Sequence, residues 1–126
     1  MIRKITFWAW AAFGWAAVIM VVSVIPGEDL PSVSIWEADK VFHALVYALL
    51  TFFSWQFLRK KYPAFNLQKN LLKVAGLCIL YGFFIELIQL ALPTRSFDLY
   101  DALANSIGCL LAVALLLLAG IATKKQ

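Results

Sequence analysis

Residues 74–92 read VAGLCILYGFFIELIQLAL, an apolar run in which Glu86 carries the only charge. An α-helix rises 1.5 Å per residue, so a run of this length covers the hydrocarbon core of a bilayer, which is about 30 Å thick. The run therefore predicts a membrane-spanning helix. Glu86 and Gln89 are polar side chains within it, and an ionisable group costs roughly 2.5 to 3.5 kcal/mol to insert at such a position. These two residues are a first indication of a functional site.

The composition extends this prediction to the whole chain. Hydrophobic residues make up 63% of the 126 residues and charged residues only 14%, against about 45–50% and 25% in a typical globular domain. Segments of about 20 residues are too long for the strands of a membrane barrel, whereas helices satisfy their own backbone groups in lipid. We therefore predict an all-α, polytopic membrane protein, a single domain over residues 1–126 with four transmembrane helices at about 5–25, 41–58, 74–92 and 102–123.

The basic residues predict the orientation in the membrane. Nine of the eleven lie before the first helix, around the middle loop or at the end of the chain, and only Lys40 and Arg95 lie on the other side. Positively charged loops stay in the cytoplasm, so both termini should be cytoplasmic. The net charge of +4 then reflects basic residues that gather at the inner face of the membrane, where they suit anionic lipid head groups. We predict no binding of nucleic acid.

Two further patterns concern packing. Ala104, Gly108 and Ala112 recur every four residues in the last segment, and small residues at this spacing let helix backbones approach closely. We interpret them as a packing face. Cys78 and Cys109 have no zinc or redox spacing, so we expect two free thiols packed as small apolar groups.

Polar side chains from three of the segments converge near one membrane face. Asp39 and His43 follow one another at i, i+4, and Glu86 and Gln89 at i, i+3, so each pair shares a helix face. Asn105 lies about one turn inside the same boundary when depth is counted by the rise per residue. Three helices should therefore deliver polar groups to one shallow layer on the outer side.

The spacing of these residues resembles a family signature. The motifs that carry the resemblance are Asp39-Lys40-x-x-His43-x-x-x-Tyr47, Glu86-x-x-Gln89, Pro93-x-Arg95 and Asp101-x-x-x-Asn105-x-x-Gly108. Together they are similar to the VanZ-like family of bacterial membrane proteins over about two-thirds of the chain. The resemblance implies the bacterial cytoplasmic (inner) membrane, a cell-envelope setting and a link to resistance to teicoplanin, a glycopeptide antibiotic. It implies no particular reaction and no oligomeric state.

The first hypothesis for this polar layer is a ligand site. We predict that it binds the anionic head group of a membrane lipid or of a lipid-linked envelope precursor, because guanidinium and ammonium groups suit phosphate, and imidazole and amide groups add hydrogen bonds. The carboxylates in the layer would repel an anion unless they are neutralised by Lys40, Arg95 or a metal. The predicted ligand-binding residues are Asp39, Lys40, His43, Glu86, Gln89, Arg95, Asp101 and Asn105.

A second hypothesis is an enzyme that modifies such a head group. His43 or Glu86 would be the general acid or base, since a buried imidazole or carboxyl can carry a proton near neutral pH. Carboxylates and an imidazole could also hold a divalent cation. However, the candidate residues Asp39, His43, Asp98 and Asp101 have no recognised ligand spacing. We therefore predict no metal and no other cofactor.

A third hypothesis is a structural clamp between helices. The bonds expected of such a clamp are Glu86 to Arg95 or Lys40, Asp101 to Arg95, and His43 to Asn105. Interhelical hydrogen bonds in membranes average only about 0.6 kcal/mol, so stabilisation alone is an inefficient use of so many ionisable groups.

The first outer loop, residues 26–39, leaves two interpretations open. Leu30, Val33 and Trp36 recur every three residues, so the segment could lie in the membrane interface and cover the polar layer. A solvated connection fits equally well, because periodicity over so short a span is weak.

Overall fold

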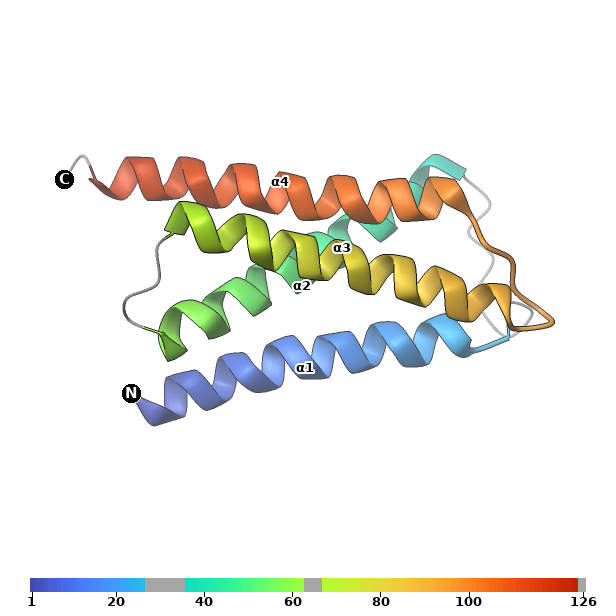
Figure 1. Ribbon diagram of the computed structural model, residues 1–126, viewed down its shortest axis with the longest axis horizontal. Coiled ribbons are helices and arrows are strands. Elements are labelled where there is room, and N and C mark those ends of the chain that lie inside the picture. The colour runs from blue at the N-terminus through green and yellow to red at the C-terminus, as the bar shows by residue number, and fades with distance from the viewer. Residues whose placement is uncertain (27–35, 63–66, 125–126) are drawn as a thin grey trace.

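The chain forms a bundle of four helices in the computed structural model, which describes residues 1–26, 36–62 and 67–124 (Figure 1). The helices are α1 (Ile2–Val24), α2 (Trp36–Lys61), α3 (Leu67–Leu90) and α4 (Leu99–Lys124). Each contains at least 22 residues of a span that is long and apolar enough to cross a membrane. The predicted all-α, polytopic membrane fold is confirmed. The start of α1 and the end of α4 lie at the same end of the bundle (Figure 1).

All four helices begin before the apolar segments that predicted them, and α1 and α3 end one and two residues earlier than predicted, at Val24 and Leu90. α2 begins at Trp36 rather than near residue 41, and α3 begins at Leu67 rather than near residue 74. A helix can continue past the hydrocarbon core into the head-group layer, where charged residues are no obstacle. Asp39 and Lys40 are therefore held on a helix. The loop for which an interfacial cover and a solvated connection were both open, residues 26–39, lies outside the described residues except for residue 26 and for residues 36–39, which belong to α2.

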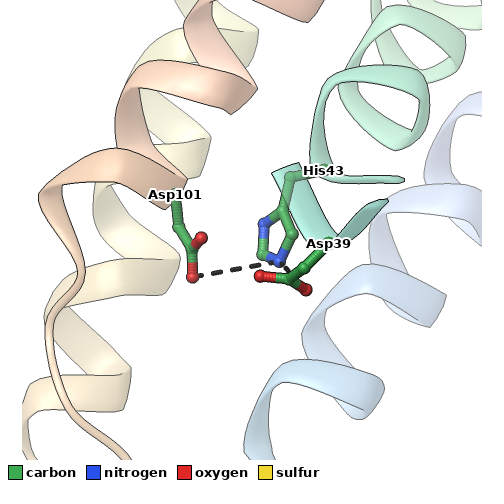
Figure 2. Close-up of side chains that lie close together, drawn as sticks. All are labelled: Asp39, His43 and Asp101. Atoms are coloured by element: carbon green, nitrogen blue, oxygen red, sulfur yellow. Dashed lines mark ion pairs between the residues drawn. The ribbon is translucent and has the colours of Figure 1, made fainter. Parts of the chain in front are cut away.

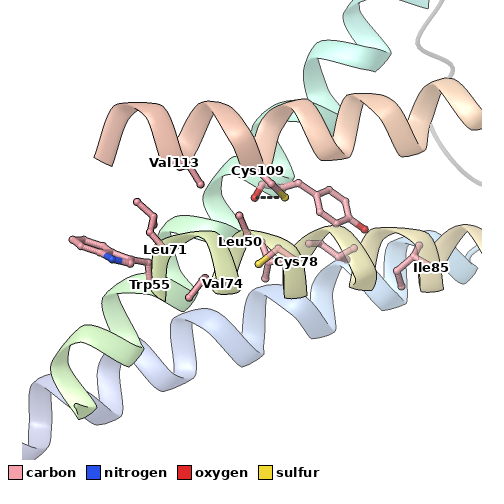
Figure 3. Packing of buried hydrophobic residues seen from close by; sticks show 11 residues of the cluster. Leu50, Trp55, Leu71, Val74, Cys78, Ile85, Cys109 and Val113 are labelled. Carbon is pink, nitrogen blue, oxygen red and sulfur yellow. Dashed lines mark hydrogen bonds between the residues drawn. The ribbon is translucent and has the colours of Figure 1, made fainter. Parts of the chain in front are cut away.

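The interior of the bundle is built mainly from α2, α3 and α4 (Figure 3). Leu71 and Cys109 are fully buried, and Cys78 lies in the same cluster. Both thiols are free, as predicted. Large apolar side chains such as Leu80 and Leu115 are exposed on the outside, which suits a surface that faces acyl chains.

α2 and α4 approach one another closely at Gly108. A Cβ atom added to Gly108 would lie 2.0 Å from the carbonyl oxygen of Ala44 and 2.8 Å from its Cα. Only a residue without a side chain fits at this crossing. Ala104 and Ala112, one turn to either side, are buried, which confirms the predicted packing face. Because His43 directly precedes Ala44, the crossing also sets the distance between α2 and α4 at the polar layer.

Candidate functional site

The first turns of α2 and α4 bring one ammonium and three carboxylates together. Lys40 Nζ contacts Asp101 Oδ1 and lies 3.1 Å from Asp98 Oδ2 and 3.4 Å from Asp39 Oδ2. The Lys40 side chain is only 13% exposed, so its charge is held mostly away from water. Three carboxylates around one ammonium make this end of the bundle acidic. We call the following residues the acidic cluster: Asp39, Lys40, His43, Asp98, Asp101 and Asn105.

His43 joins the two helices within the acidic cluster (Figure 2). Its Nε2 lies 3.5 Å from Asp39 Oδ1 and 3.9 Å from Asp101 Oδ2. Its Nδ1 lies 3.3 Å from Asn105 Oδ1, so the predicted contact between His43 and Asn105 is confirmed. Asp39 and His43 are one turn apart on α2, and Asp101 and Asn105 one turn apart on α4, so two i, i+4 pairs face each other across the crossing.

Glu86 supports the acidic cluster from the bundle interior. Its side chain is 1% exposed, and its Oε2 accepts a hydrogen bond of 3.2 Å from the backbone N–H of Asp98. Asp98 directly precedes α4, and its Oδ1 accepts a hydrogen bond of 2.8 Å from the N–H of Tyr100. This is the geometry of a helix N-cap. Glu86 thus positions the residue that begins α4.

The Asp98 carboxyl is held in its charged form. Burial alone would raise its pKa, but the Lys40 ammonium and the Tyr100 N–H stabilise the carboxylate and hold the pKa below its ordinary value of 3.8. The ionised Asp98 is therefore part of the electrostatics of the site at neutral pH. The predicted ligand set did not include Asp98, although a position just before a helix, typical of an N-cap, could have indicated it.

Gln89 and Arg95 lie away from the acidic cluster, at the C-terminal end of α1. Gln89 Nε2 donates a hydrogen bond of 3.2 Å to the carbonyl of Ser23. Arg95 donates from Nε and Nη2 to the carbonyl of Ile25, at 3.1 and 2.9 Å, and from Nη2 to that of Val22, at 3.4 Å. The last carbonyls of a helix lack partners within the helix, and a positive charge there is favourable. These two side chains therefore cap α1.

The predicted ligand set thus divides between two places. Five of its members meet in the acidic cluster, Glu86 lies behind them, and Gln89 and Arg95 cap α1. Asp101 pairs with Lys40, in place of the partnership with Arg95 that a clamp was expected to have.

We expect Arg95→Ala to loosen the attachment of α1. Hydrogen bonds to charged groups contribute about 1.5 to 3 kcal/mol, so the free energy of unfolding should fall by about 2 kcal/mol. The measurement is unfolding of the detergent-purified protein in increasing dodecyl sulfate, followed by circular dichroism. Arg3→Ala removes the same charge from an exposed position at the opposite end of the bundle. An equal loss in both variants would contradict the capping role.

The fold and the acidic cluster define a multi-pass helical membrane protein with a charged site at one end of its bundle. The VanZ/LLP1 family model matches residues 2–120, so the chain belongs to this family, as its motifs predicted. It is also 35% identical over 99 residues to Uncharacterized protein C11E3.10 of Schizosaccharomyces pombe (strain 972 / ATCC 24843). The aligned region covers 78% of this chain and 57% of that relative, so this chain spans little more than half of its length. No solved structure matches the chain.

Proposed function

We propose that the acidic cluster recognises the head group of an envelope lipid or of a lipid-linked envelope precursor. The observation that carries the proposal is the convergence of ionisable side chains at the first turns of α2 and α4, at one end of a bundle whose helices are long and apolar enough to span a membrane. Such groups are costly at membrane depth and persist mainly where they pair or work. His43 remains 26% exposed, so a ligand can reach its ring.

The charges of the acidic cluster restrict the chemistry of the head group. Arg95, which would suit a phosphate, is bonded to the carbonyls of α1, and Lys40 is surrounded by carboxylates. A bare anion would be repelled by Asp39 and Asp98. The cluster therefore favours a head group that presents amines, hydroxyls or a bound cation beside its phosphate. Amine-bearing phospholipids and peptide-bearing cell-wall precursors have this chemistry, and binding of such precursors would account for a role in teicoplanin resistance.

The proposal places the acidic cluster on the outer side of a bacterial cytoplasmic membrane, with both chain termini in the cytoplasm. Its support is the basic end of α2, residues 59–61, which lies at the opposite end of that helix. A cysteine introduced at Ser96 should react with a membrane-impermeant maleimide in intact cells. One introduced at Lys61 should react only after permeabilisation. The reverse pattern would overturn the orientation.

Native mass spectrometry of the purified protein tests head-group binding. We expect the wild-type protein to carry a co-purified lipid and His43→Gln to reduce its occupancy at least about tenfold, since a hydrogen bond to a charged group contributes about 1.5 to 3 kcal/mol. Gly76→Ala is the control, because a Cβ added at Gly76 meets nothing within 4 Å. Equal lipid occupancy in the wild type and in His43→Gln would contradict recognition through the acidic cluster.

An enzyme acting on the same head group is a second candidate, favoured by the 3.5 Å distance between His43 Nε2 and Asp39 Oδ1. A carboxylate beside an imidazole is the arrangement of many general bases. Glu86, the other candidate acid or base, is occupied by the N–H of Asp98, so His43 is the better one. In that case His43→Gln would keep the lipid but stop turnover of a labelled envelope precursor. Loss of the lipid itself would favour binding alone.

A further inference from the structure

We propose that Asp39, His43 and Asp101 bind one divalent cation. Each residue offers one ligand atom, and the two carboxylate oxygens and the imidazole nitrogen all lie within 4.8 Å of one another (Figure 2). The sequence offers these three residues, with Asp98, as possible cation ligands, but their spacing matches no recognised motif because Asp101 comes from a different helix. The α2–α4 crossing at Gly108 brings the three together.

The distances suit the ligands of a single ion. Two ligands at about 2.1 Å from a tetrahedral cation lie about 3.4 Å apart. His43 Nε2 lies 3.5 Å from Asp39 Oδ1 and 3.9 Å from Asp101 Oδ2. The two carboxylate oxygens also lie within 4.8 Å of one another, so the side chains would have to close toward this spacing to place all three atoms in one coordination sphere.

The second atom of each ligand is held by an outer partner. Lys40 Nζ lies 3.4 Å from Asp39 Oδ2 and contacts Asp101 Oδ1, which leaves the opposite oxygen of each carboxylate facing His43. Asn105 Oδ1 lies 3.3 Å from His43 Nδ1. Outer partners of this kind orient metal ligands and fix the protonated nitrogen of a ligating histidine. The acidic cluster has such a partner for all three ligands.

The contact with Asn105 also determines what His43 presents to the carboxylates. If Nδ1 donates its proton to the Asn105 oxygen, Nε2 of the neutral ring carries a lone pair directed at Asp39 and Asp101. Three electron-rich atoms then face one another, and a cation bound among them would relieve their mutual repulsion. The Lys40 ammonium contacts the other oxygen of each carboxylate, Asp39 Oδ2 and Asp101 Oδ1.

Zn²⁺ or Mn²⁺ suits this mixture of one imidazole and two carboxylates better than Ca²⁺ or Mg²⁺, which prefer oxygen ligands alone. Three protein ligands leave a further coordination position open. A phosphate oxygen of the head group would fill that position, and the cation would offset the repulsion between the carboxylates and an anionic ligand. This last step rests on the proposed function, whereas the cation site itself does not.

The test uses the purified full-length protein in detergent, stripped of metal and titrated with ZnCl₂ or MnCl₂ alone. We expect one ion per chain by native mass spectrometry and by the loss of the free Mn²⁺ signal in electron paramagnetic resonance. Asp39→Asn, His43→Gln and Asp101→Asn should each weaken binding about 100-fold or more, because outer partners alone are worth 10- to 100-fold. Asn105→Ala should weaken it about 10-fold, as an outer partner.

Asp98→Asn is the matched control. It removes the same charge from a carboxylate that lies 3.1 Å from Lys40 but offers no ligand atom to the set, and asparagine keeps the helix cap. It should weaken binding less than about fivefold, through longer-range charge alone. A loss as large as that of Asp39→Asn, or the absence of a bound ion from the wild type, would overturn the proposal.

Measuring the co-purified lipid in the same samples separates the two proposals. Lipid that stays bound to a protein without any bound ion overturns the cation site and leaves head-group recognition standing. An ion bound by a protein that carries no lipid supports the cation site and counts against head-group recognition. Loss of the lipid on chelation, with its return on addition of Zn²⁺ or Mn²⁺, supports both.

Discussion

Gly108→Ala is expected to lower the free energy of unfolding by about 3 kcal/mol or more, because overpacking typically costs about 1 to 3 kcal/mol and this contact lies at the severe end of that range. The added methyl group would lie 2.0, 2.7 and 2.8 Å from the carbonyl oxygen, carbonyl carbon and Cα of Ala44. All three are backbone atoms, so no rotation of a side chain can relieve the overlap. α2 and α4 would have to separate, and with them His43 and Asn105.

The glycines of this chain supply a graded set of controls for Gly108→Ala. A Cβ atom at Gly76 or Gly14 meets nothing within 4 Å, and one at Gly82 lies 3.1 Å from the ring of Tyr47. Gly76→Ala and Gly14→Ala should therefore leave stability unchanged or raise it slightly, since alanine is the better helix former. The stability of Gly82→Ala should lie between that of Gly76→Ala and that of Gly108→Ala. Dodecyl sulfate unfolding measures all four, and equal stability of Gly108→Ala and Gly76→Ala would refute the close crossing.

Lys40→Met is expected to have the second largest effect, a loss of about 3 kcal/mol. Removing one partner of a largely buried ion pair leaves the other charges uncompensated, which costs about 3 to 5 kcal/mol when burial is complete. Here three carboxylates lose their shared ammonium, although those of Asp39 and Asp98 are 38% exposed, which reduces the cost. Lys73→Met is the matched control, because Lys73 is an exposed lysine of α3.

A double substitution separates lost charge pairing from lost packing at Lys40. Methionine keeps most of the aliphatic length of lysine, so neutralising a carboxylate at the same time should restore stability. We expect Lys40→Met with Asp101→Asn to be more stable than Lys40→Met alone, a non-additive result of the kind found for residues in one ion-pair network. A loss no larger than that of Lys73→Met, or strict additivity in the double variant, would show that the ammonium does not hold this end of the bundle together.

The four helices could be predicted from the sequence because lipid leaves few alternatives. In lipid, the backbone groups of each long apolar segment must form their hydrogen bonds within the protein. A helix achieves this within residues 74–92 and within each of the other segments. The ends of the helices were less predictable. Hydropathy identifies only the part of a helix that lies in the hydrocarbon core. α2 begins at Trp36 and α3 at Leu67, in regions outside that core where charged residues are tolerated.

The acidic cluster could be predicted in part, from the i, i+4 spacing of Asp39 with His43 and of Asp101 with Asn105. The role of Arg95 could not. Its partners are the backbone carbonyls of Val22 and Ile25, and because every residue carries a carbonyl, no sequence pattern distinguishes those two. The choice of Lys40 as the ammonium among the carboxylates likewise depends on how α4 lies against α2.

The position of the acidic cluster has a consequence for bioenergetics. Moving an elementary charge across a full transmembrane voltage of 100 mV changes its free energy by about 2.3 kcal/mol, and a charge that crosses only part of the field experiences a proportionally smaller change. The cluster lies at the first turns of α2 and α4, so an ion that arrives there from the adjoining water crosses little of that field. The occupancy of the acidic cluster should therefore depend on the ion concentration in that water. It should be the same in cells with and without a membrane potential.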